Sequence, residues 1–309
     1  CPAMMMYNFG SAVLRAVGDT KRPLYYLTVA GILNIVLNLF FVIVFNMDVA
    51  GVALATIISQ CLSMALVINC LRKEEGALKF SFRKMKIHRE KFKAILQIGL
   101  PAGLQGAIFS VSNVLIQSTV NSFGSIAMAG NTAASNIEGF VYVAMNSMYQ
   151  SAISFTGQNM GAQKYKRVNK ILYVCQGYVC LFGITLGLLA YFFGTVLLGF
   201  YTNDPEVIQY GLLRMSIICP TYFTCGIMDT MVGSLRGMGY SVIPMIVSLT
   251  GACGLRIVWI FTVFKFLSPT LTTLYISYPV TWVVTALCHI ITFIIVRHRF
   301  PKDDVVTAT

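Results

Sequence analysis

The chain has 309 residues, of which 57% are hydrophobic and only 11% are charged, and its mean hydropathy is +0.74. Soluble domains carry roughly 25% charged residues, so this composition excludes a water-soluble or disordered protein and indicates one that crosses a lipid bilayer several times. A net charge of +12 would suggest nucleic-acid binding in a soluble protein. In a membrane protein basic residues instead set the orientation of the spans, and we expect no nucleic-acid partner.

Eight long apolar runs predict membrane-spanning helices. They lie at residues 23–46, 49–71, 94–123, 126–158, 170–198, 207–235, 244–267 and 271–296. Each run is long enough for a tilted helix across a hydrocarbon core of roughly 30 Å. Residues 1–15 look like the last part of a ninth helix that begins before the sequence.

The basic residues lie mainly on one side of these spans. If residues 1–15 run inward, 20 of the 23 Lys and Arg residues fall at the same side, nine of them within residues 72–93. The opposite turns carry a single lysine, Lys265. This asymmetry follows the positive-inside rule and predicts a cytoplasmic C-terminus. Residues 73–93 are the one long linker, which we interpret either as an amphipathic segment on the membrane surface or as a solvated basic loop.

Two stretches share the pattern L-R-x-x-G-x4-P, at residues 14–23 and 235–244, and each follows a Cys-Pro pair. Six helices separate the two copies, so both point the same way, as in the parallel repeats of transporters. We expect the glycine to end one helix and the proline to begin the next. By symmetry, the intact protein would have about three more helices before residue 1, and about twelve in two six-helix lobes.

Several motifs resemble those of the multidrug and toxic compound extrusion (MATE) family. The residues that carry the resemblance are S-A-V-L-R-A-V-G-D-T-K-R-P at 11–23, Asn34-x3-Asn38, G-V-A-L-A-T at 51–56, G-L-P at 99–101, G-Q-N-M-G-A at 157–162 and L-R-G-M-G at 235–239. Their order implies an all-α polytopic membrane protein with two six-helix lobes, of which about nine helices are present. Residues 1–72 would be helices 4–6 of the first lobe, 73–93 a cytoplasmic linker, and 94–309 the second lobe.

The resemblance also implies an activity and two candidate ion sites. Family members are secondary exporters that exchange Na⁺ or H⁺ for organic, often cationic, compounds. In several of them a first-lobe cation site uses an aspartate of helix 1, an Asn-x3-Asp pair and a threonine. Asn34, Asn38 and Thr56 fall at the matching places, with Asn38 where an aspartate is usual. Other members bind the cation in the second lobe through a glutamate of helix 7 and an aspartate of helix 10, which Asp229 matches. Residues 94–123 contain no acidic side chain, so both sites are incomplete.

Four formally charged side chains fall inside the predicted spans: Glu138, Arg214, Asp229 and Arg256. Each costs ~2.5 kcal/mol or more at mid-bilayer unless it faces protein, a partner or water. Polar residues recur at helical spacing on three of the spans, which indicates either hydrogen bonds between helices or a wet cavity. These stripes are Ser110, Asn113, Gln117 and Asn121; Asn131, Ser135, Glu138, Tyr142, Asn146 and Tyr149; and Ser277, Thr281, Thr285 and His289.

The roles of the intramembrane charges follow from their depth. Asp229 lies about 10 Å and Arg256 about 18 Å from the inner ends of their helices, at 1.5 Å per residue. We expect Arg256 to pair with Glu138 or with Asp229, either as a static ion pair or as one that a proton or cation can break. Arg214 lies nearer the outer end and is expected to snorkel toward water. We expect His289 to be a packed helix residue.

These observations predict an efflux transporter that works by alternating access. Asp229 and Glu138, then Asn34, Asn38 and Thr56, are the candidate coupling residues; Arg256, Asn131, Tyr142, Asn146, Asn113 and Gln117 are candidates for lining the cavity or forming an ion pair. The expected partners are a small organic substrate and the lipid bilayer of a bacterial cytoplasmic membrane, with the protein a monomer. Na⁺ or H⁺ is the only expected cofactor, and no metal site, disulfide or catalytic group is predicted. The alternatives are a related lipid-linked oligosaccharide flippase, with a more cationic cavity, and less plausibly a receptor or channel.

Overall fold

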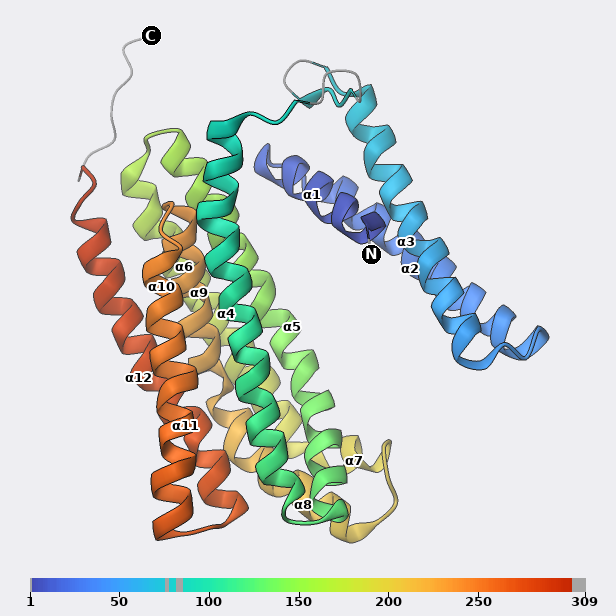
Figure 1. Cartoon of the computed structure of the whole chain (residues 1–309), viewed down its shortest axis with the longest axis vertical. Helices are drawn as coiled ribbons and strands as arrows, with labels where there is room; N and C mark the ends of the chain where they lie inside the picture. The colour runs from blue at the N-terminus through green and yellow to red at the C-terminus, as the bar shows by residue number, and fades with distance from the viewer. Residues whose placement is uncertain (1, 76–77, 82–85, 302–309) are drawn as a thin grey trace. The chain divides into compact units, whose positions relative to one another are not determined.

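A computed structural model describes residues 2–75, 78–81 and 86–301, and the regular elements in this part of the chain are all helical (Figure 1). Contacts divide the chain into two compact units, Cys1–His88 and Arg89–Thr309. The assignment of residues 1–72 and 94–309 to two lobes remains a prediction.

The described part of the first unit contains three long helices. They are α1 (Pro2–Ala16), α2 (Lys21–Leu39), which continues into the π-helical η1 (Phe40–Val44), and α3 (Asp48–Lys73). Tyr7 and Leu14 of α1 pack against Val67 and Leu71 of α3. Phe80 packs against the same cluster, and its amide donates to the carbonyl of Leu71. Residues 76–77 and 82–85 of the predicted linker lie outside the described residues, and its last residues form the first turn of α4.

The second unit contains the remaining helices. They are α4 (Arg89–Asn121), α5 (Ser125–Gly161), α6 (Tyr165–Phe192), α7 (Gly194–Gly199), α8 (Pro205–Ile218), η4 (Cys219–Thr221), α9 (Tyr222–Gly237), α10 (Val242–Ser248), η5 (Leu249–Gly254), α11 (Leu255–Trp259), η6 (Ile260–Leu267) and α12 (Leu271–Arg297). Each of the eight predicted apolar runs is therefore largely helical. The elements α8, η4 and α9 form one long segment, and α10, η5, α11 and η6 form another.

By length and composition, seven helical segments of the described chain could cross a membrane. They correspond to seven of the eight predicted runs. The eighth, residues 126–158, lies in α5, which is 37 residues long but is not among these segments. The polar stripe through Asn131, Ser135 and Glu138, with Thr132 and Asn136 beside it, explains the difference because it lowers the hydropathy of α5.

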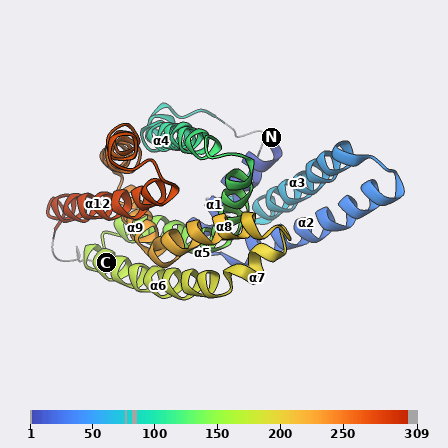
Figure 2. The ribbon, with the colours of Figure 1, turned by 90° about the horizontal axis from the view of Figure 1, so that it is seen from below.

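Within the second unit, α5 and α9 form the centre. Helix α5 contacts α6, α8 and α9, and α9 lies between α5 and α12 (Figure 2). Small residues allow these close approaches: an added Cβ on Gly130 of α5 would lie 2.6 Å from the carbonyl oxygen of Val207, and one on Gly233 of α9 would lie 2.8 Å from that of Tyr149. Close packing at small residues is the usual way in which membrane helices associate.

The two L-R-x-x-G-x4-P copies form the same turn. Helix α1 ends at Ala16 and α9 at Gly237, and Gly18 and Gly239 then adopt positive φ angles of 89° and 90°. In each copy the glycine amide donates to the carbonyl of the arginine, at 3.0 Å from Gly18 and 2.9 Å from Gly239. In both copies the next helix begins three residues after the glycine, with Pro23 or Pro244 in its first turn. The expected helix–turn–helix role of the repeat is thus observed in both units.

Candidate functional site

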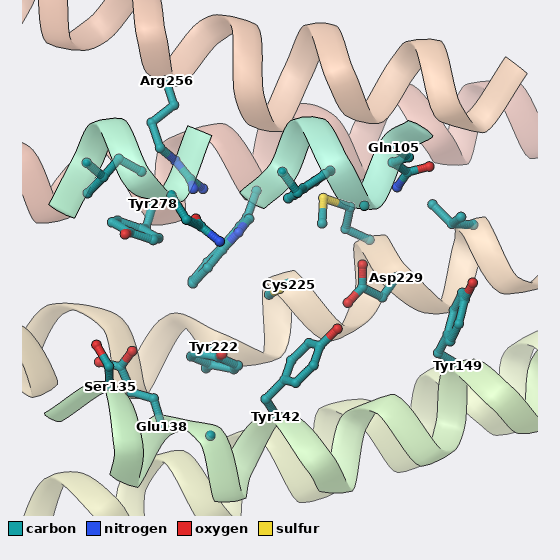
Figure 3. A pocket seen from close by; sticks show the side chains of 18 of the residues that line it. Gln105, Ser135, Glu138, Tyr142, Tyr149, Tyr222, Cys225, Asp229, Arg256 and Tyr278 are labelled. Carbon is teal, nitrogen blue, oxygen red and sulfur yellow. The ribbon is translucent and has the colours of Figure 1, made fainter. Parts of the chain in front are cut away.

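The second unit contains an open cavity of about 650 Å³ (Figure 3). Its walls come from α4, α5, α8, α9, α11 and α12, and they carry aromatic, polar and charged side chains. Among the predicted residues, Asn113, Gln117, Asn131, Glu138, Tyr142, Asp229 and Arg256 line it. Asn146 is not among the lining residues. The polar stripes of α4 and α5 therefore face a shared cavity and also hydrogen-bond to each other.

At one end of this cavity Glu138 and Arg214 form a buried, two-pronged ion pair. Arg214 donates from Nε to Oε1 of Glu138 at 2.9 Å and from Nη2 to Oε2 at 2.7 Å. Its Nη1 donates to Oδ1 of Asn131 at 2.8 Å. The same Oδ1 atom also accepts a hydrogen bond from the Tyr275 hydroxyl. Asn131 in turn donates to Oε1 of Gln117 at 2.9 Å. This network connects α4, α5, α8 and α12.

The expectations that Arg214 snorkels and that Arg256 pairs with a carboxylate are both wrong. Arg214 is only 6% exposed because its side chain is directed at α5, and it lies nine residues into α8, about 14 Å along the axis. The close approach of α5 to α8 at Gly130 brings it within reach of Glu138. Because Arg214 occupies both carboxylate oxygens, Glu138 is satisfied without Arg256.

Arg256 has no carboxylate partner among the described residues. Its side chain is buried, Nη2 donates to Oγ1 of Thr281 at 3.1 Å, and its guanidinium lies 4.1 Å from the centre of the Tyr278 ring. The Nε atom is buried without a hydrogen-bond acceptor in the described chain. In Figure 3, Arg256 and Tyr278 face Glu138 and Tyr222 across the cavity.

Asp229 lies toward the other end of the cavity, on α9. It is half-buried, faces Tyr142 and Tyr149 of α5 (Figure 3), and forms no hydrogen bond or ion pair with the described residues. Arg236, two turns further along α9, donates to the Tyr149 hydroxyl and, at 2.9 Å, to Oε1 of Gln105. These contacts connect α4, α5 and α9 in the cavity wall. Sequence reasoning identified Asp229 but missed Arg236 and Gln105 as lining residues, although Arg236 stands in the repeat motif.

The predicted first-lobe residues gather between α2 and α3. Asn38 donates to Oδ1 of Asn34 at 3.1 Å, and Asn34 donates to the Ser59 hydroxyl at 3.2 Å. The Thr56 hydroxyl donates to the carbonyl of Val52 in its own helix, and Ser59 donates to the carbonyl of Thr56. The Oδ1 atom of Asn38 is buried without a donor in the described chain. The cluster contains amide, hydroxyl and carbonyl oxygens but no carboxylate.

Outside the cavity, His289 is fully buried and its Nε2 lies 3.0 Å from the Ser248 hydroxyl. It is thus a packed helix residue. No group of three or more His, Cys, Asp or Glu side chains in residues 2–75, 78–81 and 86–301 is arranged to hold a metal ion.

Comparison with known families decides which kind of protein this is. Residues 101–262, about half of the chain, match the model of the MatE family. The chain belongs to the MatE family. Residues 1–105 also match a model described as the lipid II flippase MurJ. The family resemblance inferred from the motifs is confirmed, and this MatE chain is a multi-pass membrane protein.

Curated relatives and solved structures agree with this assignment. The chain is 30% identical over 250 residues to the probable multidrug resistance protein YpnP of Bacillus subtilis, covering 81% of this chain and 56% of the relative. It is 24% identical over 293 residues to YoeA of the same organism, which is also named a probable multidrug resistance protein. This match covers 93% of this chain and 63% of YoeA. It therefore spans about three fifths of these relatives. A crystal structure of a mutant Vibrio cholerae MATE transporter, VcmN, has the same fold, with a TM-score of 0.87, 22% identity, and coverage of 97% of this chain and 68% of that one.

Proposed function

We propose that the protein is a secondary active efflux transporter that exchanges Na⁺ or H⁺ for organic compounds with a cationic group, by alternating access. The support is its family membership, the names of its relatives, and a cavity with aromatic and charged walls inside a membrane-spanning helical unit. Tyr142, Tyr222 and Trp282 offer aromatic faces to an organic cation.

The main support for this proposal is that Asp229 faces the cavity without an ion-pair partner in the described chain. A carboxylate inside the membrane is costly unless it faces water or a partner, and Asp229 faces the cavity without an ion pair in the described chain. It is therefore available to a proton, to Na⁺ or to the cationic group of a substrate. Because only one of these can occupy it at a time, binding of the coupling ion releases the substrate. Glu138, already bound to Arg214, is not available in the same way.

The test is efflux of ethidium from cells that lack their main drug exporters and express the complete gene. Wild type should export ethidium, and Asp229→Asn should lose at least about tenfold in initial rate. The matched control is Asp204→Asn, the same chemical change at the exposed N-cap of α8, where asparagine caps as well as aspartate. Comparing rates with and without Na⁺ identifies the ion. Full efflux by Asp229→Asn at equal expression would refute the role of Asp229.

We propose further that the coupling ion is the only cofactor, that the protein works as a monomer, and that it catalyses no chemical reaction. Gel filtration with light scattering of the purified protein checks the monomer. A mass equal to two or more chains would refute it.

A lipid-linked flippase is the second candidate, because residues 1–105 match the lipid II flippase model and Arg256 makes the cavity more cationic. The two functions differ in a measurable way. A flippase would move a fluorescent lipid-linked diphosphate between the leaflets of proteoliposomes and export no ethidium. We expect ethidium export without lipid movement.

A further inference from the structure

The charges that line the cavity do not balance. Its cations are Arg214, Arg236 and Arg256, and its carboxylates are Glu138 and Asp229. Arg214 and Glu138 neutralise each other at 2.7 Å. Even with Asp229 ionised, one positive charge is left over. A substrate with only positive charge would increase this excess in a medium where charges interact strongly, whereas a substrate with an acidic group would offset it.

Arg236 and Arg256 both lack a carboxylate partner in the described chain, and each keeps a buried Nε without an acceptor. Arg236 donates to Tyr149 and Gln105 and is partly exposed, so the more deeply buried of the two is Arg256. It is 97% buried, makes one hydrogen bond to a neutral hydroxyl, and keeps Nε without an acceptor. A buried, unsatisfied charge of this kind costs free energy that an arriving anion would recover. The guanidinium presents a planar fork of donors that suits carboxylate and phosphate oxygens.

The surroundings of Arg256 suit an aromatic acid. Tyr278, which lies beneath the guanidinium, contacts Trp282 edge to face with ring centres 5.5 Å apart, and Trp282 contacts Tyr222 in the same way at 5.3 Å. These three rings line the cavity, with Tyr278 against the guanidinium and Tyr222 on the opposite wall. Arg256 itself stands in the five-residue α11, between the π-helical η5 and η6, and π-helical turns are frequent at functional sites.

We propose that Arg256 is a specificity-determining residue of the cavity: its guanidinium binds the carboxylate or phosphate group of those aromatic substrates that carry one, while their cationic group lies near Asp229. The two charges enter the same cavity from α11 and α9, with Cys225 between them in the view of Figure 3. This inference rests on the proposed function, because it specifies which substrates that site prefers.

Rhodamine B and its ethyl ester provide a matched pair of probes. Both carry the same cationic ring system, and only rhodamine B has a free carboxylate. Binding of each dye to the purified complete transporter is measured by fluorescence anisotropy. Wild type should bind the acid about tenfold or more tightly than the ester, the usual scale of a hydrogen-bonded charge pair. Arg256→Gln should abolish this preference, and Arg256→Lys should retain part of it.

Lys265→Gln is the matched control. It removes one positive charge from the same long helical segment, but Lys265 is exposed and does not line the cavity. Its preference for the acid should equal that of wild type. The comparison of the two dyes on wild type needs no variant, so it stands even if Arg256→Gln fails to fold.

Equal or tighter binding of the ester by wild type would overturn this role of Arg256, as would an unchanged preference in folded Arg256→Gln. Failure of both dyes to bind would also overturn it. None of these results bears on ethidium efflux or on its dependence on Asp229, so failure of the Arg256 proposal and failure of the exporter proposal can be told apart.

Discussion

Two carboxylates lie in the same cavity but in different states. Glu138 accepts two hydrogen bonds from Arg214 and is 4% exposed, whereas Asp229 is half-buried without an ion pair in the described chain. A paired buried carboxylate holds helices together, and an unpaired one can exchange ligands. At the residue scale we therefore assign stability to Glu138 and ion exchange to Asp229.

The assignment of Glu138 predicts a large loss of stability in Glu138→Gln. The change would leave Arg214 buried without its counter-charge, which typically costs about 3–5 kcal/mol. The melting temperature of the purified protein measures the effect. Replacing both partners with apolar residues, Glu138→Leu with Arg214→Met, should recover most of the loss because no charge is left unpaired. A melting temperature equal to wild type in Glu138→Gln would contradict the structural role.

The sequence predicts some of these residues and not others, for physical reasons. Asp229 could be found because an acidic side chain in an apolar span is itself informative. The pairing of Glu138 with Arg214 joins residues 76 positions apart and depends on how closely α5 approaches α8, which no single helix reveals. Arg256 was expected to pair with Glu138 or with Asp229 because it lies at a similar depth. Depth alone does not say which face of the helix meets α5.

At the element scale, Gly187 is one of two glycines, with Gly183, at which α6 closely approaches the α8–α9 segment. An added Cβ on Gly187 would fall on the carbonyl oxygen of Cys219, where α8 passes into η4. Because this obstacle is backbone, a side-chain rearrangement cannot relieve it. The small residue thus helps to set the distance between these elements.

Gly187→Ala should therefore destabilise the protein by about 3 kcal/mol, as expected for overpacking against backbone. The matched control is Gly177→Ala, also in α6, where an added Cβ meets nothing within 4 Å. This variant should be neutral or gain about 0.5–1 kcal/mol from helix propensity. Thermal melting of the two purified variants gives the comparison, and equal melting temperatures would argue against the close contact.

The repeated turn provides a second element-scale prediction. Gly18→Ala and Gly239→Ala should each cost about 1–2 kcal/mol, because both glycines have φ near +90° and neither has a steric neighbour within 4 Å. Gly161→Ala, at the end of α5 and equally free of neighbours but without a positive φ, should cost much less. Similar losses in all three variants would show that backbone conformation is not the cause.

At the scale of the whole molecule, the helices of the second unit alternate in direction (Figure 1). The turn after α9 and the C-terminal end of α12 lie at one end, with Leu235, Phe293 and Val296 in one cluster. The turns before α5 and α12 lie at the other end, with Val120 and Leu271 together. The basic loops thus gather at a single end of this unit, in agreement with the charge pattern.

This arrangement predicts which loops face the cytoplasm. In a cysteine-free background, Lys164→Cys should react with a membrane-impermeant maleimide only after cells are opened, because the basic loops are expected inside. Asn203→Cys, in the turn before α8, should react with intact cells. Both positions are exposed. Labelling from the reversed sides would overturn the predicted orientation.

The number and order of the helices were predictable from the sequence because apolar run length and the L-R-x-x-G-x4-P repeat are local signals. Helix α5 shows the limit of such signals. Its polar face made it the least apolar of the predicted runs, yet that same face lines the cavity. The first-lobe residues Asn34, Asn38 and Thr56, which the family resemblance placed in one site, connect through Ser59, and their role as an ion site stays a prediction.

The most direct test of the central claim, that Asp229 couples an ion gradient to substrate movement, uses proteoliposomes of the complete transporter. Ethidium accumulation is followed after a Na⁺ gradient or a pH gradient is imposed. Wild type and Asp204→Asn should accumulate ethidium above equilibrium with one of the two gradients, and Asp229→Asn, equally well folded by its melting temperature, should not. Gradient-driven accumulation by Asp229→Asn at the wild-type level would contradict the account.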